Sequence, residues 1–195
     1  NRQINLSAAR TETDLRAHVV DSLHVIPYLR PATAPAPHGV TRRGDPDAPA
    51  DVPPGDEVTP QPAKFLDVGA GGGLPAVIVA ICLPEAVVTA LEPVHKKHAF
   101  LRAVARELAL DNLQPIAERV DQHPVNSYDA ATSRATFDLH EWLTLGLRLV
   151  RPGGVVLGFE ALLRDDLPSA TVRHPYTLDD RTRAIVELRR PTDVP

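Results

Sequence analysis

The ten residues that decide the fold are Leu66-Asp67-Val68-Gly69-Ala70-Gly71-Gly72-Gly73-Leu74-Pro75. They join two apolar runs, residues 64–68 and 75–83, of which the first has the pattern of a strand and the second that of a helix. Where a strand feeds a helix, the backbone bends tightly and approaches a ligand closely, and glycine permits both without a Cβ clash. The helix N-terminus adds free N–H groups and a positive dipole end. The stretch therefore predicts a ligand-binding turn.

Around this turn the chain alternates between strand-like and helix-like segments. Helices are predicted over residues 11–29, 75–83, 95–110 and 139–150, and strands over 64–68, 87–91, 113–116, 128–132, 155–159, 169–176 and 183–189, with a turn at 151–154. Such alternation indicates a mostly parallel, seven-stranded sheet with helices on both faces, the α/β class. The last two strands have no clear helix between them, so they should form an antiparallel hairpin at one edge.

Composition excludes several classes of protein. With 195 residues, 43% hydrophobic and 24% charged, the chain predicts one globular domain over residues 1–195. No stretch approaches the roughly 20 apolar residues of a membrane span. One cysteine excludes a disulfide framework and a multi-cysteine zinc site, so we predict no metal and a cytoplasmic location. A net charge of −4 argues against nucleic-acid binding by bulk positive charge, although a local basic patch stays open.

Residues 30–63 interrupt the pattern. They hold the densest cluster of the chain's 20 prolines, an acidic run from Asp45 to Glu57 and few large apolar side chains. Such a segment cannot bury enough surface to offset its ordering entropy, so we predict a disordered insertion within the domain. The chain contains no methionine, and therefore lacks an initiator, from which we expect an N-terminal truncation.

The spacing of the glycines separates two classes of cofactor. The dinucleotide fingerprint, G-x-G-x-x-G, would need glycine at position 74, which is Leu74. The chain instead has G-x-G-x-G, with an acidic residue two positions before the first glycine. This pattern, formed by Asp67, Gly69, Gly71 and Gly73, resembles the first motif of class I S-adenosylmethionine (SAM) methyltransferases.

A second acidic residue supports a nucleotide-like cofactor. The ribose hydroxyls should be bound by a carboxylate about 20 residues further on, at the end of the second strand. Glu92 follows the strand at 87–91 and fits this position. The alternative is a glycine-rich loop without a ligand, with Glu92 as a surface carboxylate.

Six motifs, in order along the chain, resemble one family. They are Asn5-Leu6-Ser7-Ala8, His18-Val19-Val20-Asp21-Ser22-Leu23, Gly73-Leu74-Pro75, Lys96-Lys97 with Phe100-Leu101, Arg119-Val120-Asp121 and Ser133-Arg134-Ala135. The family is that of the bacterial small-subunit ribosomal RNA guanine-N7 methyltransferases, RsmG or GidB. The likeness runs from Asn5 to about Arg190 and is interrupted only by residues 30–63.

The resemblance implies a fold, a reaction and partners. The fold would be that of class I SAM-dependent methyltransferases, which is Rossmann-like. The reaction would move a methyl group from SAM to guanine N7 in 16S ribosomal RNA or the small ribosomal subunit, by a monomer. Because N7 already carries a lone pair, nothing needs deprotonating, and we assign no catalytic acid or base. Rate acceleration should come from holding N7 in line with the methyl carbon.

The resemblance also implies site residues. Gly69 and Leu74 would touch SAM, and Val120 and Asp121 would flank its adenine. Arg134 would lie at the active-site mouth as a positioning group that contacts cofactor or RNA. The motif that contains His18, Asp21 and Ser22 would pack over the cofactor pocket. His18, Lys96 and Lys97 would contact the RNA substrate, the two lysines at its phosphates.

Each role has a structural alternative. His18 and Asp21 could bond each other, Arg134 could be a structural ion-pair partner, and Lys96 and Lys97 could belong to a solvated helix face, as we expect for Arg102 and Arg106. Cys82 and Trp142 lie in apolar patterns and are predicted core residues.

The chain departs from the family at one presumed RNA-facing position. The family's Lys-Gly after the strand at 155–159 is here Glu160-Ala161, and an anion there would repel phosphate. We therefore keep two alternatives: a SAM-dependent methyltransferase acting on another RNA or a small molecule, and a non-catalytic relative that binds SAM or RNA. On this hypothesis Glu160→Lys should strengthen RNA binding.

Overall fold

A computed structural model describes residues 11–29 and 61–192 of the chain. The motif at residues 5–8 and nearly all of the predicted insertion at 30–63 lie outside the described residues. The strands are β1 (Lys64–Val68), β2 (Val87–Leu91), β3 (Leu113–Ile116), β4 (Tyr128–Ser133), β5 (Val150–Glu160), β6 (Val172–Leu178) and β7 (Arg181–Arg189). The helices are α1 (Glu12–Leu23), α2 (Ala76–Cys82), α3 (His95–Glu107) and α4 (Leu139–Leu149), with short 3₁₀ turns η1 (Ile26–Tyr28) and η2 (Val120–Gln122).

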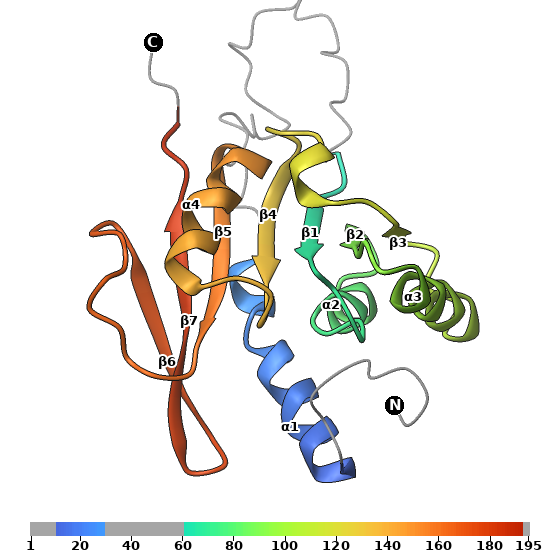
Figure 1. Ribbon diagram of the computed structural model, residues 1–195, viewed down its shortest axis with the longest axis horizontal. Helices are drawn as coiled ribbons and strands as arrows, with labels where there is room; N and C mark the ends of the chain where they lie inside the picture. The colour runs from blue at the N-terminus through green and yellow to red at the C-terminus, as the bar shows by residue number, and fades with distance from the viewer. Residues whose placement is uncertain (1–10, 30–60, 193–195) are drawn as a thin grey trace, which may run out of the picture.

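The seven strands form one sheet in the order β3-β2-β1-β4-β5-β7-β6 (Figure 1). The first five in this order are parallel, whereas β7 runs antiparallel to both β5 and β6. The predicted mostly parallel sheet with an antiparallel hairpin at one edge is therefore confirmed. The chain order reverses between β1 and β4, which is where open α/β sheets bind ligands.

Two apolar cores cover the two faces of the sheet. Adjacent residues of a strand point to opposite faces, and Phe65 belongs to one core while Leu66 belongs to the other. The first core includes η1, α2 and Leu101 of α3, and the second includes Trp142 of α4. Helices thus cover both faces, as predicted, and Figure 1 shows α4 across β4 and β5. Trp142 is buried, and its indole N–H donates to the Leu157 carbonyl at 2.8 Å.

Helix α1 begins where the sequence predicts. The Thr11 side chain accepts the Asp14 N–H, and the Asp14 carboxylate accepts the Thr11 N–H, which is a capping box. The helix predicted over 11–29 nevertheless ends at Leu23, and the 3₁₀ turn follows at Pro27, which has no N–H to donate. On this helix Leu23 is exposed, whereas the charged Asp21 is buried.

Three smaller predictions were also wrong. Residues 151–154 form part of β5 rather than a turn, because the Gly153 N–H and the Gly154 carbonyl both bond Arg190 beyond the end of β7. The helix predicted to reach residue 110 ends at Glu107. Cys82, predicted to be core, is exposed at the last residue of α2. None of the helices in the described ranges has the length and apolar character that crossing a membrane requires.

Candidate active site

The glycine turn after β1 explains its own spacing. Gly69, Gly71 and Gly73 have φ angles of +71°, +53° and +88°, in the left-handed region that other residues rarely adopt. A glycine is therefore required at every second position, which gives G-x-G-x-G. The Gly69 N–H donates to the carbonyl of Leu91 at 2.8 Å, so the turn is tied to the end of β2. A Cβ at Gly69 would lie 2.3 Å from Oγ1 of Thr136, so the segment after β4 covers its other side.

Two buried carboxylates support this turn. Asp67, 1% exposed at the penultimate position of β1, accepts the N–H of Ala76 at 3.1 Å and so holds the first turn of α2. Glu92, 3% exposed after β2, accepts the Gly71 N–H through Oε2 and the Val94 N–H through Oε1, both at 2.9 Å. Glu92 is thus not the surface carboxylate of the alternative interpretation.

The electrostatics of this pair favour a cationic ligand. Burial raises the pKa of Asp67 to about 7, and the neighbouring Glu92 adds to the rise. The hydrogen bond from Ala76 and the positive charge of Arg134 act in the opposite direction. A ligand that brings a further positive charge would stabilise the ionised form of Asp67. A sulfonium cofactor therefore fits the residues present.

Arg134 follows β4 directly and connects the turn to helix α1. Its Nη1 donates to the carbonyl of His18 at 3.3 Å and lies 3.4 Å from Oδ2 of Asp21. Its guanidinium carbon lies 5.8 Å from the centre of the Phe159 ring on β5. The side chain is 14% exposed. Arg134 lines a cavity at this edge of the sheet and also forms the structural ion pair of the alternative interpretation, so its contact with cofactor or RNA stays a prediction.

Asp21 is the centre of a buried polar cluster. Its Oδ1 accepts from the Tyr176 hydroxyl at 2.6 Å and lies 3.4 Å from Nη1 of Arg183. Burial, together with the bond to Asp21, raises the pKa of Tyr176, which stays a neutral donor. Burial and the charge of Arg134 lower the pKa of His18, so that its ring is neutral at pH 7. The alternative prediction was that His18 and Asp21 bond each other. Asp21 instead accepts from the side chains of Tyr176 and Arg183 in the hairpin.

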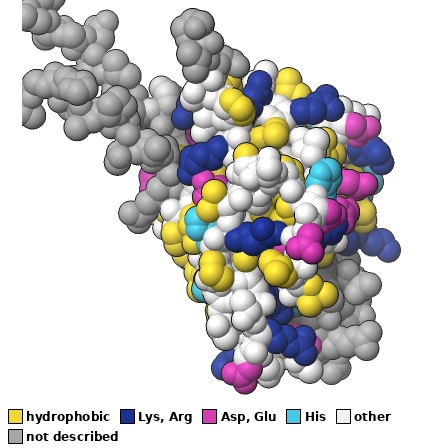
Figure 2. Space-filling view, turned by 90° about the vertical axis from the view of Figure 1, so that its left-hand side faces the viewer, with side chains coloured by type: hydrophobic (Ala, Val, Ile, Leu, Met, Phe, Trp, Pro, Cys, Tyr) yellow, Lys and Arg dark blue, Asp and Glu magenta, His cyan; other side chains and the backbone are white. Residues whose placement is uncertain are grey.

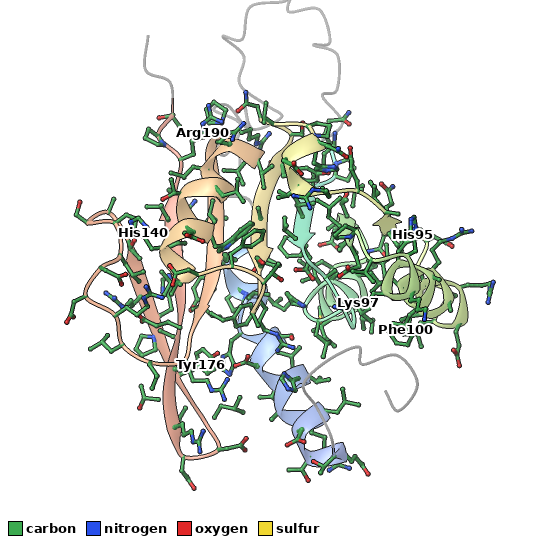
Figure 3. All side chains as sticks on the ribbon, viewed as in Figure 1. His95, Lys97, Phe100, His140, Tyr176 and Arg190 are labelled. Atoms are coloured by element: carbon green, nitrogen blue, oxygen red, sulfur yellow. The ribbon has the colours of Figure 1, made fainter. Side chains whose placement is uncertain are left out.

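Sequence analysis missed Tyr176 and Arg183 because they act together only through the fold. They lie on different strands of the hairpin and are register partners in the β6–β7 pairing. Figure 3 shows Tyr176 beside α1, more than a hundred residues away along the chain. No local pattern in the sequence marks this contact.

The residues predicted to flank adenine and phosphate lie on the β2–β3 side of the turn. Val120 is half-buried in η2, and Asp121 is exposed and pairs with Arg119 Nε at 3.1 Å. Lys96 is exposed and Lys97 half-buried in the first turn of α3. Figure 3 shows Lys97 and Tyr176 on opposite sides of the glycine turn. The roles of these four residues stay predictions.

Glu160 is not the exposed anion that the expected repulsion of RNA requires, although it lines the cavity beside Arg134, and its effect on RNA binding stays a prediction. Glu160 is 4% exposed at the end of β5. Its two oxygens accept from Nε and Nη2 of Arg173 at 2.8 and 3.1 Å, and Oε1 also accepts the Arg164 N–H at 3.0 Å. The carboxylate is neutralised inside the protein, where it anchors the loop after β5.

A cavity of about 700 Å³ opens beside Arg134. It lies between α1 and the carboxyl ends of β4 and β5, and its lining includes the Phe137 and Phe159 rings and the side chains of Leu162 and Leu163. Figure 2, which views the molecule from the hairpin side, shows basic and acidic side chains interspersed with hydrophobic ones. Binding at this face would therefore depend on shape and individual groups rather than on a broad basic surface.

The sequence matches proteins of known family. A family model described as rRNA small subunit methyltransferase G matches residues 55–170. A protein named ribosomal RNA small subunit methyltransferase G from Psychrobacter arcticus is 42% identical over 111 residues, which cover 57% of this chain and 44% of that protein. Proteins of the same name from Bordetella avium and Bordetella pertussis are 36% and 33% identical and cover 82% and 95% of this chain. The chain spans 61% of the former and 72% of the latter.

Solved structures share the fold. The SAM-dependent methyltransferase SibL in its apo form superposes with a TM-score of 0.56 at 20% identity, over 67% of this chain and 51% of that chain. A precorrin-6y C5,15-methyltransferase from Geobacter metallireducens superposes with a TM-score of 0.51 at 14% identity, over 67% of this chain and 81% of that chain. The predicted class I SAM-dependent methyltransferase fold is confirmed.

Proposed function

Because the chain belongs to the rRNA small subunit methyltransferase G family, we propose that it transfers a methyl group from SAM to N7 of a guanine in 16S ribosomal RNA. The observation that carries the proposal is the glycine turn with its two buried carboxylates, Asp67 and Glu92, at the carboxyl edge of the sheet. The substrate would be the free RNA or the small ribosomal subunit, met by a monomer in the cytoplasm.

SAM would supply a methyl group made electrophilic by its sulfonium charge. The residues that would hold SAM are Gly69, Gly71, Gly73, Leu74, Val120 and Asp121, with Asp67, Glu92 and Arg134. In the carboxylate of Glu92 each oxygen accepts one N–H and can still accept a ribose hydroxyl, since carboxylate oxygens offer about four lone-pair sites. Asp67 would act through its charge, because its carboxylate already holds the start of α2.

On the acceptor side the protein would position guanine without removing a proton. Arg134 is held by α1 and faces the cavity, so it can orient a base or its phosphate there. A base bound in the cavity would displace water from the reacting atoms. Within a folded RNA the guanine would have to leave its stack to enter.

Lys96 and Lys97 support an anionic partner. Both lie in the first turn of α3, which contains no acidic residue and has no side-chain cap. Cations at a helix N-terminus are unfavourable because they meet the positive end of the helix dipole. Contact with RNA phosphates would offset this cost.

The proposal is tested by binding and by product mapping. Calorimetry should detect SAM but not NAD, and small subunits from cells lacking the modification should gain N7-methylguanine in their 16S RNA. Gly69→Ala should lose SAM binding. Gly153→Ala is the matched control, because it bears similar left-handed strain (φ +77°) on β5, near Thr192, and should retain binding. Methylation at another atom, or SAM binding without transfer to RNA, would contradict the proposal.

A further inference from the structure

Two adjacent leucines project into solvent beside the cavity. Leu162 and Leu163 are 81% and 80% exposed, more than any other large hydrophobic side chain in the described ranges. Single exposed apolar residues are common and need no explanation. Here two neighbours are exposed at one loop position and both line the same cavity as Arg134.

The loop that carries them is fixed by ion pairs on both sides of the leucines. Before them, Glu160 is buried and pairs with Arg173. After them, the Arg164 guanidinium contacts Asp138 at the start of α4 at 2.5 Å and Asp166 at 2.6 Å. Leu162 and Leu163 therefore lie on a loop that ion pairs hold in place, and such a loop loses little conformational freedom when it binds.

The proposed reaction requires an apolar group that can fill a gap in the RNA stack, and these side chains could do so. A guanine that leaves its stack to enter the cavity leaves a gap between neighbouring bases, and proteins that unstack nucleic acid insert apolar side chains at such steps. Phe137 and Phe159 are among the residues that line the cavity beside Arg134, and aromatic side chains suit a planar base. The leucines lie on the same lining and are open to solvent.

We propose that Leu162 and Leu163 form an apolar wedge that enters the RNA stack and holds the target guanine in the cavity. This inference rests on the proposed function, because it names how that site obtains its substrate. The ligand of the wedge is the face of the bases that flank the guanine.

The test compares folded and single-stranded RNA for the double variant Leu162→Ala/Leu163→Ala of the full chain. The folded probe is a 16S fragment that contains the guanine the wild type methylates, and the second probe is a short unpaired oligoribonucleotide of the same sequence. We expect kcat/KM on the folded RNA to fall by about tenfold or more, because the variant no longer offsets the cost of unstacking, and to change less than about twofold on the oligoribonucleotide. The Kd for SAM should be unchanged.

A fluorescent probe measures unstacking apart from catalysis. With 2-aminopurine in place of the target guanine, the wild type should raise the fluorescence of the folded RNA and the double variant should not. Leu162→Met/Leu163→Met keeps apolar volume and should behave as wild type. Ile81→Ala/Leu108→Ala removes two half-exposed apolar side chains elsewhere and is the control.

Three results would overturn the wedge. The first is a double variant that methylates the folded RNA at the wild-type rate. The second is an equal loss of kcat/KM on both RNAs, in which case the leucines are walls of the cavity or a protein-binding site. The third is a 2-aminopurine fluorescence that the wild type leaves unchanged. If the wild type methylates neither RNA nor the assembled subunit, the proposed function itself fails, and this outcome is separate from the other three.

Discussion

Asp67→Asn should remove the pH dependence of SAM binding. Asp67 is buried beneath the glycine turn, and its carboxylate and that of Glu92 form a negative site with Arg134 as the nearby cation. An ionised Asp67 attracts a sulfonium, and a protonated one does not. Asparagine keeps the shape and an oxygen that can accept the Ala76 N–H, so the substitution changes charge while the start of α2 is held.

The size of the effect follows from the pKa of Asp67, which burial raises to about 7. A carboxyl group with this pKa is mostly ionised at pH 8, half ionised at pH 7 and about one-tenth ionised at pH 6. If SAM binds the ionised form, its apparent Kd should rise by roughly tenfold from pH 8 to pH 6, which corresponds to about 1.4 kcal/mol. Below pH 6 each further pH unit should add about another factor of ten.

The assay is calorimetry at pH 8, 7 and 6 with two ligands. S-adenosylhomocysteine has a neutral sulfur, so its Kd should depend on pH much less than that of SAM. Asp67→Asn should bind SAM more weakly than the wild type at pH 8, and its Kd for SAM should be the same at pH 8, 7 and 6. An equal pH dependence for both ligands, or a pH dependence that survives in Asp67→Asn, would refute the electrostatic role.

The folding stability of the unliganded protein checks the same pKa independently. A raised pKa means that Asp67 favours folding fully below its unfolded value of 3.8 and that this contribution is lost as the pH rises through 7. Asp67→Asn should therefore gain stability relative to wild type as the pH is raised from 4 to 8, measured by urea unfolding. A constant difference between the two proteins would show that the pKa is not raised.

Three further predictions concern the rest of the site. Asp21→Asn breaks a buried ionic cluster and should lower the free energy of urea unfolding by about 3 kcal/mol, and a loss below 1 kcal/mol would contradict the cluster. Glu160→Lys should lower the free energy of urea unfolding by about 3–5 kcal/mol without strengthening RNA binding. The charge-swapped variant Glu160→Lys/Arg173→Glu should recover part of that stability. Lys96→Ala/Lys97→Ala should lower the salt dependence of RNA binding by about two units in slope with SAM affinity retained, and an unchanged slope would exclude phosphate contact.

The conformation of the glycine turn and the position of its carboxylates could be predicted from sequence because their causes are local. Positions 69, 71 and 73 have a left-handed φ, which strongly favours glycine, so the pattern Gly69, Gly71 and Gly73 directly indicates the backbone conformation. Glu92 lies at the end of the next strand along the chain, and parallel strands bring their carboxyl ends to one edge. Both inferences need only the neighbouring β-α-β unit.

The polar contacts of Asp21 and Glu160 could not be predicted because their causes are distant. Glu160 looked like a surface anion since its partner, Arg173, lies 13 residues later across a loop that no periodicity describes. The burial of Asp21 could not be foreseen because the cations and the hydroxyl that stabilise it come from the segment after β4 and from the hairpin. A buried charge is tolerable only when it is paired, so its position can be predicted only together with its partners.

This division has a functional consequence. Arg134 faces the cavity from a loop, and the groups that hold it, the His18 carbonyl and Asp21, come from a helix that is itself tied to the hairpin by Tyr176. In Figure 1 α1 lies beyond the ends of β1 and β4, with the lower part of the hairpin on its left. A change in Asp21 should therefore alter kcat and the KM for RNA more than the Kd for SAM. The glycine turn has its own supports in Asp67 and Glu92, and so the cofactor site does not depend on that cluster for its shape.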